Sequence, residues 1–441
     1  MFAYKRALWK KYSHFQAFFK EILKMFKYTI RVSIKNLQDR PIQKNGKIQR
    51  IEVKAMHLTA DQKVSTTFSR TNPFQAQILK NINLNGAGSS KETRHIELSL
   101  RGSGLSYKPG DCLGIIPKND SELVADLLEE MKWNPEMDVT INKQGETLSL
   151  EEALITHFEI TLLTKKIIQQ AATFTDNEAI QSLVAVENVD QLKEYVNGRD
   201  LLDLLRDFGP WKATAQEIVS LLRKMPPRLY SIASSIAANP EEVHLTIGAV
   251  RYTAHGRERE GVCSVLCAER VQEGDTLPVF IQQNKHFNLP ESHEKDIIMV
   301  GPGTGIAPFR SFIQERAVNK ANGRSWLFFG DQHSTSDFLY KEEFEKYQQD
   351  GALSRIETAF SRDTAQKVYV QHKMLENSQE LFEWLENGAY FYVCGDKLNM
   401  AKDVHSALID VIEKEGAMTH ESAENYVKEM QEQGRYQRDV Y

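Results

Sequence analysis

A glycine-rich segment between an apolar run and a helical pattern places the strongest constraint on how this chain folds. Residues 296–300 (DIIMV) predict a buried strand, residues 301–308 read GPGTGIAP, and a helical pattern follows from Phe309 through Arg316. Glycines in such a loop let the backbone approach a diphosphate, and the following helix offers its free N–H groups. Pro308 suits the first helical turn, where a missing N–H costs nothing. The motif reads GxGxxP rather than GxGxxG, so on its own it also fits a tight turn without a ligand.

The order of β-like and helical patterns along the chain indicates the fold class. Strand-like segments alternate with helical stretches after the glycine-rich loop, which predicts a parallel, doubly wound α/β sheet. Before the loop, β-like material is interrupted by helical patterns from 119 to about 211, a helical insert. The strand-like segments lie at 95–100, 112–116, 228–235, 242–252 and 276–282 before the loop, and at 325–330, 353–360 and 389–395 after it.

A polar cluster follows the third strand of the predicted α/β region. Ser361 and Arg362 come directly after residues 353–360, and Lys367 lies five residues beyond Arg362. Carboxyl ends of strands in such sheets are where ligands bind, and these side chains suit a dianionic 2′-phosphate. An NAD site would show an acidic residue for the ribose diol instead. An ordinary solvated loop is the alternative, but together with the glycine-rich loop the cluster favours NADPH.

Composition excludes several classes of protein. With 441 residues, 41% hydrophobic and 26% charged, the chain has material for two or three globular units. No apolar run is long enough for a spanning helix, and the charged start argues against a secretion signal. Four cysteines in so long a chain indicate a reducing, cytoplasmic setting. Cys263 and Cys267 have no second pair to complete a zinc site, so we expect no metal.

The first 32 residues differ in charge from the rest of the chain. They hold eight Lys/Arg and one acidic residue, so this segment is +7 and the remainder is −12. The acidic remainder argues against nucleic-acid binding. Apolar residues within 1–32 recur at helical spacing with lysines mostly off that stripe. The segment is therefore either an amphipathic helix that touches an anionic membrane surface or a partner, or a helix packed on its own protein or a frayed extension.

Ten ordered motifs between residues 72 and 441 resemble the FAD/NADPH-binding half of the diflavin reductases. Within that family the match is closest to the flavoprotein subunits of NADPH-dependent sulfite reductase. The motifs are RLYSIASS (228–235), HLTIGAVRY (244–252), GVCS (261–264), GPGTGIAPFR (301–310), FFGDQH (328–333), SRD (361–363), KVYVQ (367–371), YVCGD (392–396), MAKDV (400–404) and RYQRDVY (435–441). The segment before residue 72 is not covered by the resemblance.

The resemblance implies an α/β plus all-β protein. Its first part is an antiparallel FAD-binding β-barrel over residues 72–290 that carries the helical connecting insert. A Rossmann-like, ferredoxin reductase-like NADPH-binding domain follows over 291–441, and residues 1–70 form a basic N-terminal extension.

The resemblance also implies which residues bind FAD. Arg228 would pair with the diphosphate, Tyr230 would pack on the isoalloxazine, and Ser231 would lie near the flavin N5. Thr161 and Asn197 on the insert could also contact FAD, although exposed helix polarity accounts better for both. Tyr441, the last residue of the sequence, would stack on the flavin until nicotinamide displaces it. The remaining FAD-binding residues implied are Leu229, Thr246, Ile247, Gly248, Tyr252, Gly261, Val262, Cys263 and Ser264.

For the hydride step, the resemblance implies that Ser231, Cys394 and Asp439 surround the reacting atoms and position them. Cys394 could instead be a buried strand-end thiol, and Asp403 an acid on a helix surface. The NADPH-binding residues implied are Gly303, Thr304, Gly305, Ser361, Arg362, Lys367, Val368, Tyr369, Val370, Gln371 and Asp403.

These expectations describe an NADPH-dependent flavoprotein reductase that uses FAD. About seventy residues precede the FAD region without strand–helix alternation or a phosphate loop, so we expect no FMN on this chain. Electrons would then leave to a separate protein, either a flavodoxin-like carrier, an iron–sulfur protein or a sirohaem subunit that serves sulfite reduction. A flavodoxin- or ferredoxin-NADP reductase is the alternative enzyme. A non-catalytic FAD/NADPH-binding regulatory subunit is the alternative from another class.

Overall fold

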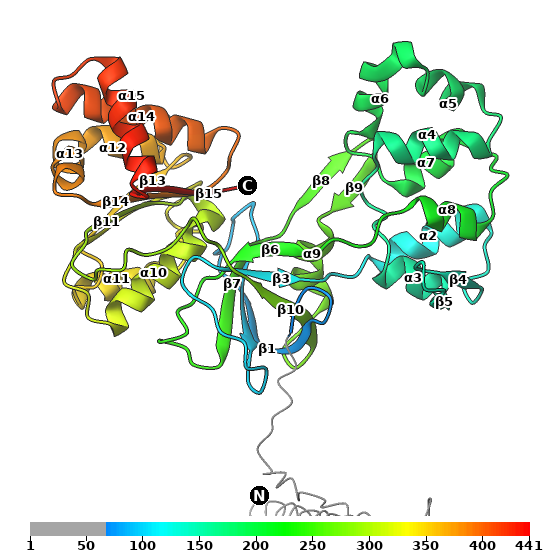
Figure 1. Cartoon of the computed structure of the whole chain (residues 1–441), viewed down its shortest axis with the longest axis horizontal. Coiled ribbons are helices and arrows are strands. Elements are labelled where there is room, and N and C mark those ends of the chain that lie inside the picture. The colour runs from blue at the N-terminus through cyan, green and yellow to red at the C-terminus, as the bar shows by residue number, and fades with distance from the viewer. Residues whose placement is uncertain (1–67) are drawn as a thin grey trace, which may run out of the picture. The chain divides into compact units, whose positions relative to one another are not determined.

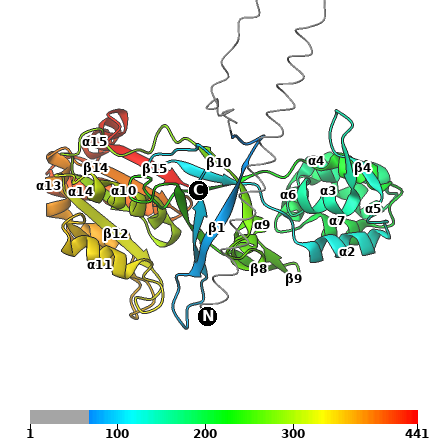
Figure 2. The same cartoon turned by 90° about the horizontal axis from the view of Figure 1, so that it is seen from below.

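The computed structural model describes residues 68–441, which Figures 1 and 2 show coloured by residue number. The hypotheses for the basic segment 1–32 lie outside these residues, as does nearly all of the predicted extension 1–70. Among the described residues, no helix is long and apolar enough to cross a membrane.

The first part of the described chain is built on a six-stranded antiparallel sheet. Its order is β6-β3-β10-β1-β2-β7, and all five strand pairs run antiparallel. Alternating side chains such as Ile96, Leu98, Leu113 and Leu245 are fully buried on one face and form its core. The strands are β1 (Phe74–Asn83), β2 (Thr93–Ser99), β3 (Cys112–Ile115), β6 (Arg228–Ser231), β7 (Glu242–Gly248) and β10 (Thr276–Gln282).

The two edge strands of this sheet, β6 and β7, meet at a single point. Ile232 forms an isolated bridge with Leu245, and the Ala233 N–H donates to the His244 carbonyl at 2.8 Å. The predicted antiparallel FAD-domain sheet is confirmed, but it is not a barrel hydrogen-bonded all the way round. One end of the sheet is covered by α9 (Val262–Val265) and the π-helical turn η3 (Leu266–Arg270), and β8 (Arg251–Ala254) forms a hairpin with β9 (Arg257–Glu260).

A helical insert connects β3 to β6, as the sequence predicts. Its helices are gathered into one group in both views (Figures 1 and 2). It continues past residue 211 to α8, where Thr214 and Glu217 form a capping box that starts one more helix. The elements are α2 (Ser121–Met131), β4 (Asp138–Thr140), β5 (Thr147–Ser149), α3 (Leu150–Thr156), α4 (Lys165–Ala171), η1 (Ala172–Phe174), α5 (Glu178–Leu183), η2 (Val186–Asn188), α6 (Val189–Val196), α7 (Leu201–Phe208) and α8 (Ala215–Leu221).

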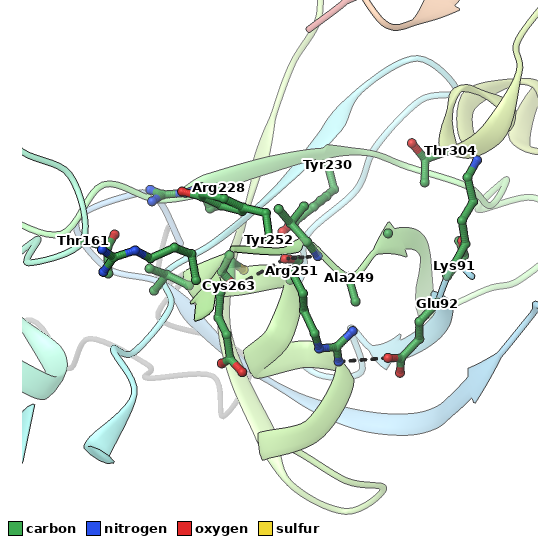
Figure 3. A pocket seen from close by; sticks show the side chains of 18 of the residues that line it. Lys91, Glu92, Thr161, Arg228, Tyr230, Ala249, Arg251, Tyr252, Cys263 and Thr304 are labelled. Carbon is green, nitrogen blue, oxygen red and sulfur yellow. Dashed lines mark hydrogen bonds and ion pairs between the residues drawn. The ribbon is translucent and has the colours of Figure 1, made fainter. Parts of the chain in front are cut away.

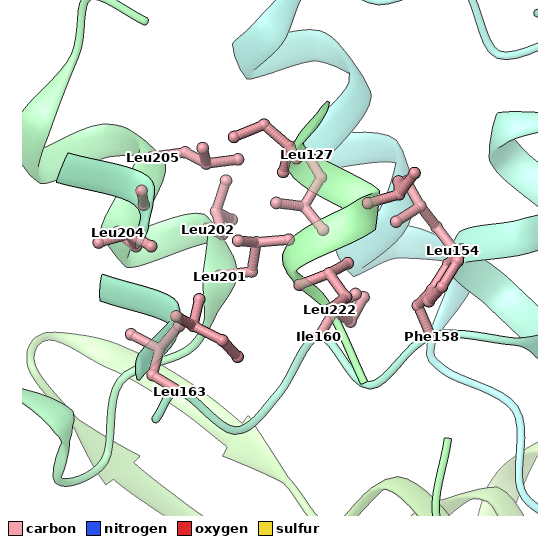
Figure 4. Close-up of a cluster of buried hydrophobic side chains, with 14 of the residues drawn as sticks. Leu127, Leu154, Phe158, Ile160, Leu163, Leu201, Leu202, Leu204, Leu205 and Leu222 are labelled. Carbon is pink, nitrogen blue, oxygen red and sulfur yellow. The ribbon is translucent and has the colours of Figure 1, made fainter. Parts of the chain in front are cut away.

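The insert has a hydrophobic core of its own. Figure 4 shows leucines of α7 packed against side chains of α2, α3 and the segment around Ile160. Helix α7 begins with Asp200, whose carboxylate accepts the Asp203 N–H while the Asp203 carboxylate accepts the Asp200 N–H. The insert is therefore a separately packed unit whose position depends on its links to the sheet.

Four charged side chains link α7 to strand β9. Arg257 donates to Asp200 at 2.9 Å and to Asp203 at 2.8 Å, and Arg259 donates to the same two carboxylates. Both aspartates and Arg259 are over nine-tenths buried. Buried charges are tolerated only when paired in good geometry, so this quartet fixes the β8–β9 hairpin against the insert.

The second part is a parallel sheet of order β13-β12-β11-β14-β15, with helices on both faces. Helices α10 and α11 cover one face, and α12 to α15 cover the other (Figure 1). The predicted doubly wound fold is confirmed. The elements are β11 (Ile297–Val300), η4 (Gly303–Ile306), α10 (Ala307–Val318), β12 (Ser325–Asp331), α11 (Lys341–Gln349), β13 (Arg355–Phe360), α12 (Val370–Glu376), α13 (Ser378–Glu386), β14 (Tyr390–Gly395), α14 (Met400–Glu415), α15 (His420–Glu432) and β15 (Tyr436–Val440).

The two sheets are joined by buried polar side chains around two histidines, His95 on β2 and His244 on β7. His95 bonds the Tyr340 hydroxyl at 3.0 Å, and His244 contacts Arg310 of α10 at 3.3 Å. Burial, followed by the nearby Arg310 charge, lowers the pKa of His95 to about 2 and that of His244 to about 4. Both imidazoles are therefore neutral in the folded protein near pH 7. The other charged groups facing them are Glu97, Glu242, Glu343 and Lys80.

The insert core predicts a contrast between two leucines. Leu202 is fully buried and Leu162 is 47% exposed. We expect Leu202→Ala to lower the free energy of unfolding by roughly 2–5 kcal/mol, because it removes apolar contacts and leaves a cavity. Leu162→Ala should change it by less than about 1 kcal/mol. Urea denaturation followed by circular dichroism measures both, and equal effects would contradict the described packing.

The histidine pair predicts a loss of stability in acid. Because the folded-state pKa values lie below the ordinary 6.5, the unfolded chain takes up protons first as the pH falls. Each histidine should therefore remove about 1.4 kcal/mol of stability per pH unit from about pH 6.5 down towards its folded pKa. Urea unfolding between pH 7 and pH 4.5 measures this slope. His95→Gln with His244→Gln should flatten it, whereas His286→Gln, at an exposed position, should not.

Candidate functional site

A cavity of about 1560 Å³ lies where the six-stranded sheet faces the glycine-rich loop of the parallel sheet (Figure 3). Both sheets, the insert and the β8–β9 hairpin contribute to its wall. Of the predicted site residues, those that line it are Thr161, Arg228, Leu229, Tyr230, Ser231, Thr246, Gly248, Tyr252, Gly261, Val262, Cys263, Ser264, Gly303, Thr304, Asp439 and Tyr441.

The other predicted site residues do not line this cavity. Ile247 and Cys394 are fully buried in their strands, and Gly305 is a buried residue of the glycine-rich loop that packs on the Cys394 carbonyl. The remaining ones, which belong to the predicted NADPH site, are Ser361, Arg362, Lys367, Val368, Tyr369, Val370, Gln371 and Asp403.

At the insert side of the cavity, a buried carboxylate positions Arg228. Arg228 donates to Glu159 at 3.1 Å, and the Thr161 N–H and hydroxyl donate to the same carboxylate at 3.0 and 2.6 Å. The Glu159 side chain is completely buried. It therefore orients both Arg228 and Thr161 along the cavity wall. Sequence reasoning missed Glu159, which belongs to none of the motifs.

The neighbouring wall fits an anionic group such as the FAD diphosphate. The Nε atoms of Arg259 and Arg270 are buried without a hydrogen-bond partner in the described chain, and both residues line the cavity. A Cβ at Gly261 would lie 2.4 Å from Ser264 Oγ, so only glycine allows this turn to pack so closely. Buried unpartnered donors are rare in native structures and indicate a ligand or water.

Arg251, on the hairpin beside this wall, is held by two acids. It pairs with Glu92 at 2.9 Å, the contact dashed in Figure 3, and also with Glu269. Figure 3 labels Lys91 and Thr304 on the far side of the same cavity, next to the glycine-rich loop. The cavity thus has arginines on its hairpin side and a lysine at its loop side.

The glycine-rich loop packs tightly on the end of β14. A Cβ at Gly305 would lie 2.2 Å from the Cys394 carbonyl oxygen, and one at Gly301 would lie 2.5 Å from the Gly305 carbonyl oxygen. Gly303 has φ of +57°, a conformation that favours glycine. The loop therefore sits between the carboxyl ends of β11 and β14, the point where the strand order reverses and ligands bind in such sheets.

The proposed hydride-transfer trio comes from three strands. Ser231 on β6 donates to Asp439 on β15 at 2.7 Å, and Asp439 pairs in register with Cys394 on β14. Burial raises the pKa of the Asp439 carboxyl, although the Ser231 hydrogen bond opposes this shift. Burial also holds the pKa of the Cys394 thiol well above its usual range. The structure brings Ser231 and Asp439 together and leaves Cys394 as a neutral, buried thiol behind them.

A fourth side chain, Cys112, lies beside this trio. It pairs with Ser231 across β3 and β6 and lines the cavity. Burial, with the nearby Asp439 carboxylate, raises the pKa of its thiol to about 12, so it carries no charge near pH 7. Sequence reasoning missed Cys112, because only the register between β3 and β6 brings it to the site.

Tyr441 is tied to the glycine-rich loop. Its hydroxyl contacts the Thr304 hydroxyl at 3.0 Å, and its N–H donates to the Gly395 carbonyl at 3.2 Å. Its side chain is 64% exposed and lines the cavity. The aromatic ring is thus fixed at the rim of the cavity and accessible to a ligand.

The predicted 2′-phosphate cluster lies at the carboxyl end of β13. The Ser361 and Arg362 N–H groups donate to the carbonyls of Asp331 and Gln332, both at 2.9 Å, which fixes the turn against the end of β12. Asp403 accepts a hydrogen bond from Gln371 at 3.2 Å. These residues share the carboxyl-end edge of the sheet with the glycine-rich loop, outside the main cavity.

An ion pair that sequence reasoning missed lies between these two regions. Lys91, just before β2, contacts the carboxylate of Asp331 at the end of β12, and Asp331 is almost completely buried. Burial raises the pKa of that carboxyl, opposed by Lys91. In NAD sites, an acidic residue at the end of the second strand binds the ribose diol. Here the acidic residue at that position, Asp331, is already paired with Lys91.

One group of potential metal ligands occurs in the described chain: His95, Glu97 and His244. All four ring nitrogens of the histidines have partners, namely Glu97, Tyr340, Glu242 and Arg310. A cation there would also face the Arg310 guanidinium. The arrangement therefore fits the polar joint between the sheets better than a metal centre.

Two family comparisons match the chain in the order of its two sheets. Residues 66–266 match the FAD binding domain, and residues 299–406 match the oxidoreductase NAD-binding domain. The first match covers the insert and all strands of the six-stranded sheet except β10, and the second covers most of the parallel sheet.

Similar proteins include three called sulfite reductase [NADPH] flavoprotein alpha-component. The one from Bacillus subtilis is 62% identical over 382 residues, which is 87% of this chain and 63% of the relative. Those from Vibrio parahaemolyticus and Citrobacter koseri are each 46% identical, over 85% and 86% of this chain and 59% and 62% of the relatives. The chain thus spans about three fifths of the length of these relatives. The two domain matches and the similarity to these relatives indicate that the chain combines an FAD-binding domain with an NAD-binding domain.

Proposed function

We propose that this chain binds FAD and NADPH, catalyses hydride transfer from NADPH to FAD, and delivers the electrons to a separate acceptor protein. The observation that carries the proposal is the 2.7 Å hydrogen bond between Ser231 and Asp439. It joins β6, the strand that would contact the flavin, to β15, which lies next to β14 and the glycine-rich loop where the nucleotide would bind. Both ligands would then meet in one cavity.

The FAD side is supported by the chemistry of the cavity wall. Arg228 and the unpartnered guanidinium nitrogens of Arg259 and Arg270 would hold the diphosphate. Tyr230 would pack on the isoalloxazine, and Tyr252, 47% exposed, would face the adenine side. When bound, FAD supplies the redox chemistry itself, accepting a hydride and releasing electrons to another carrier.

The nucleotide side divides into two parts along the sheet edge. The glycine-rich loop and the start of α10 would hold the diphosphate, with Lys91 as a nearby cation. Ser361, Arg362 and Lys367 would bind the 2′-phosphate, with residues 368–371 and Asp403 alongside them. The neutralised Asp331 removes an acid that would repel that phosphate.

Where the two ligands would meet, side chains of this chain would position the reacting rings and fill the space around them. Ser231 and Asp439 would orient the nicotinamide against the flavin, and the uncharged Cys394 would close the space behind them. Tyr441, held by Thr304 at the rim, would cover the flavin until the nicotinamide takes its place.

The acceptor we propose is a sirohaem subunit that serves sulfite reduction, because the similar proteins are called flavoprotein components of sulfite reductase. Four free cysteines suit the reducing cytoplasm. Turnover of sulfite with a sirohaem partner supports this acceptor, whereas reduction of a flavodoxin alone would favour a flavodoxin reductase. The FAD-binding region would span about 72–290 and the NADPH-binding region 291–441.

The phosphate cluster predicts coenzyme preference. Anaerobic mixing of the FAD-loaded protein with NADPH should bleach the flavin absorbance faster than mixing with NADH. Arg362→Ala should raise KM for NADPH roughly 10- to 100-fold, because a charged hydrogen-bond partner contributes about 1.5–3 kcal/mol, and should leave the NADH reaction unchanged. Lys428→Ala, at an exposed helical position, is the control. Equal bleaching by the two coenzymes in the unsubstituted protein would refute the cluster's role.

The serine at the meeting point predicts a loss of rate without a loss of binding. Ser231→Ala should slow flavin bleaching at saturating NADPH by roughly tenfold or more, because one positioned hydrogen bond to a charged group is lost. The FAD content should stay the same, since the diphosphate contacts are intact. Ser99→Ala on β2 is the matched control. An unchanged rate for Ser231→Ala would count against the hydride site described.

A further inference from the structure

A single buried arginine on α10 reaches from the parallel sheet to the six-stranded sheet. Arg310 donates through Nη1 to the Ala233 carbonyl at 2.7 Å and contacts His244 Nδ1 at 3.3 Å. Its Nε donates to Glu343 of α11 at 2.8 Å, and Arg310 is only 7% exposed. A guanidinium buried this deeply needs partners on every side. Arg310 finds them only when both sheets are in place.

The two residues that Arg310 contacts on the six-stranded sheet are close in sequence to residues of the candidate site. Ala233 lies two residues after Ser231, and His244 two residues before Thr246 on β7. Helix α10 begins at Ala307, within the last residues of the glycine-rich loop, so Arg310 lies in the first turn of the helix, two residues beyond that loop. A second close approach lies nearby, where a Cβ at Gly248 would be 3.3 Å from Thr304 Cγ2. The arginine therefore spans from the flavin-side strand to the nucleotide loop.

Further hydrogen bonds hold the same segments together. Gln314, one turn along α10, accepts the Ser235 N–H at 2.9 Å and donates to Glu343 at 3.1 Å. Glu343 thus supports both Arg310 and Gln314. Glu315, next to Gln314 on α10, accepts a hydrogen bond from the Ser235 hydroxyl at 2.5 Å, so a second charged side chain of this helix contacts the β6–β7 connection.

Tyr340 adds a rigid support beneath the guanidinium. Its ring lies 4.8 Å from Arg310 Cζ, and its hydroxyl contacts Thr246 at 2.7 Å and His95 at 3.0 Å. Its backbone has φ of +57°, an uncommon conformation for a bulky residue that persists only when its surroundings impose it. Tyr340 therefore holds Arg310 and strands β2 and β7 in a fixed arrangement.

We propose that Arg310 is a positioning residue for hydride transfer, which sets the nucleotide loop against the flavin-side strand through Ala233 and His244. This inference rests on the proposed function. Arg310 does not line the cavity, so it acts on the reaction only through the orientation of the two sheets. A small shift of one sheet against the other would slow hydride transfer rather than weaken binding, because each ligand keeps its own contacts.

The test compares Arg310→Gln with Arg316→Gln. Arg316 lies on the same helix and is equally buried, but all its hydrogen bonds are to the parallel-sheet part of the chain. They go to the Ser325 hydroxyl and to backbone carbonyls at residues 295, 323 and 324. We expect Arg310→Gln to slow anaerobic flavin reduction by saturating NADPH roughly 10- to 100-fold and to weaken the nicotinamide–flavin charge-transfer absorbance. FAD content and calorimetric affinity for 2′,5′-ADP should stay within about twofold, because each region still folds. Arg316→Gln should lower the melting temperature without changing the rate per bound FAD.

A second measurement does not depend on catalysis. Hydrogen exchange in the FAD-loaded protein without nucleotide should accelerate at residues 233–246 and 301–316 in Arg310→Gln, but not at 233–246 in Arg316→Gln. If Arg310→Gln fails to fold, Arg310→Lys, which keeps the charge but loses the fork of donors, decides the question with the same measurements. A rate equal to that of the unsubstituted protein in the folded variant would overturn the proposal. Failure of the unsubstituted protein to oxidise NADPH would instead refute the proposed function.

Discussion

The close approach of the glycine-rich loop to β14 is the constraint on which the candidate site depends. Any side chain at Gly305 would collide with the Cys394 carbonyl and push the loop off the strand end. Asp439 lies beside Cys394 in register and bonds Ser231 of the other sheet. Such a shift would therefore also disturb the contact between the two sheets. Glycine at position 305 thus keeps the glycine-rich loop, the buried Cys394 thiol and Ser231 in a single arrangement.

Buried charges set the orientation of the parts around that arrangement. The Asp200–Asp203–Arg257–Arg259 quartet holds the hairpin on the insert, and Arg310 holds the parallel sheet on the antiparallel one. Replacing such groups by apolar ones of the same volume often leaves stability unchanged, whereas removing one partner leaves a costly unpaired charge. These buried charges therefore fix the relative orientation of the parts rather than add stability. Two surfaces in apolar contact can shift against each other, whereas the directed hydrogen bonds of a guanidinium group resist such a shift.

The sequence predicted the features that local patterns encode. The loop at 301–308, the strand alternation around it and the motif from Arg228 to Ser231 all depend on residues close together in the chain. Cys112, Glu159 and the Lys91–Asp331 pair depend on long-range register and could not be found this way. Strand β15 was also not predicted as a strand, because YQRDV is a polar edge segment without apolar alternation. The antiparallel β-barrel was inferred from resemblance, and in the structure a single bridge, between Ile232 and Leu245, joins the two edges of the sheet.

The pairing of Asp331 with Lys91 bears on how coenzyme use in this fold could be redesigned. Removing the cations that we propose bind the 2′-phosphate would weaken the binding of NADPH without creating a site for the ribose diol of NADH. The carboxylate that a ribose diol requires is present at the end of β12, but it is buried and neutralised by a lysine from the opposite sheet. A change of coenzyme would therefore need substitutions in both halves of the protein, because one half carries the acid and the other carries the cation that masks it.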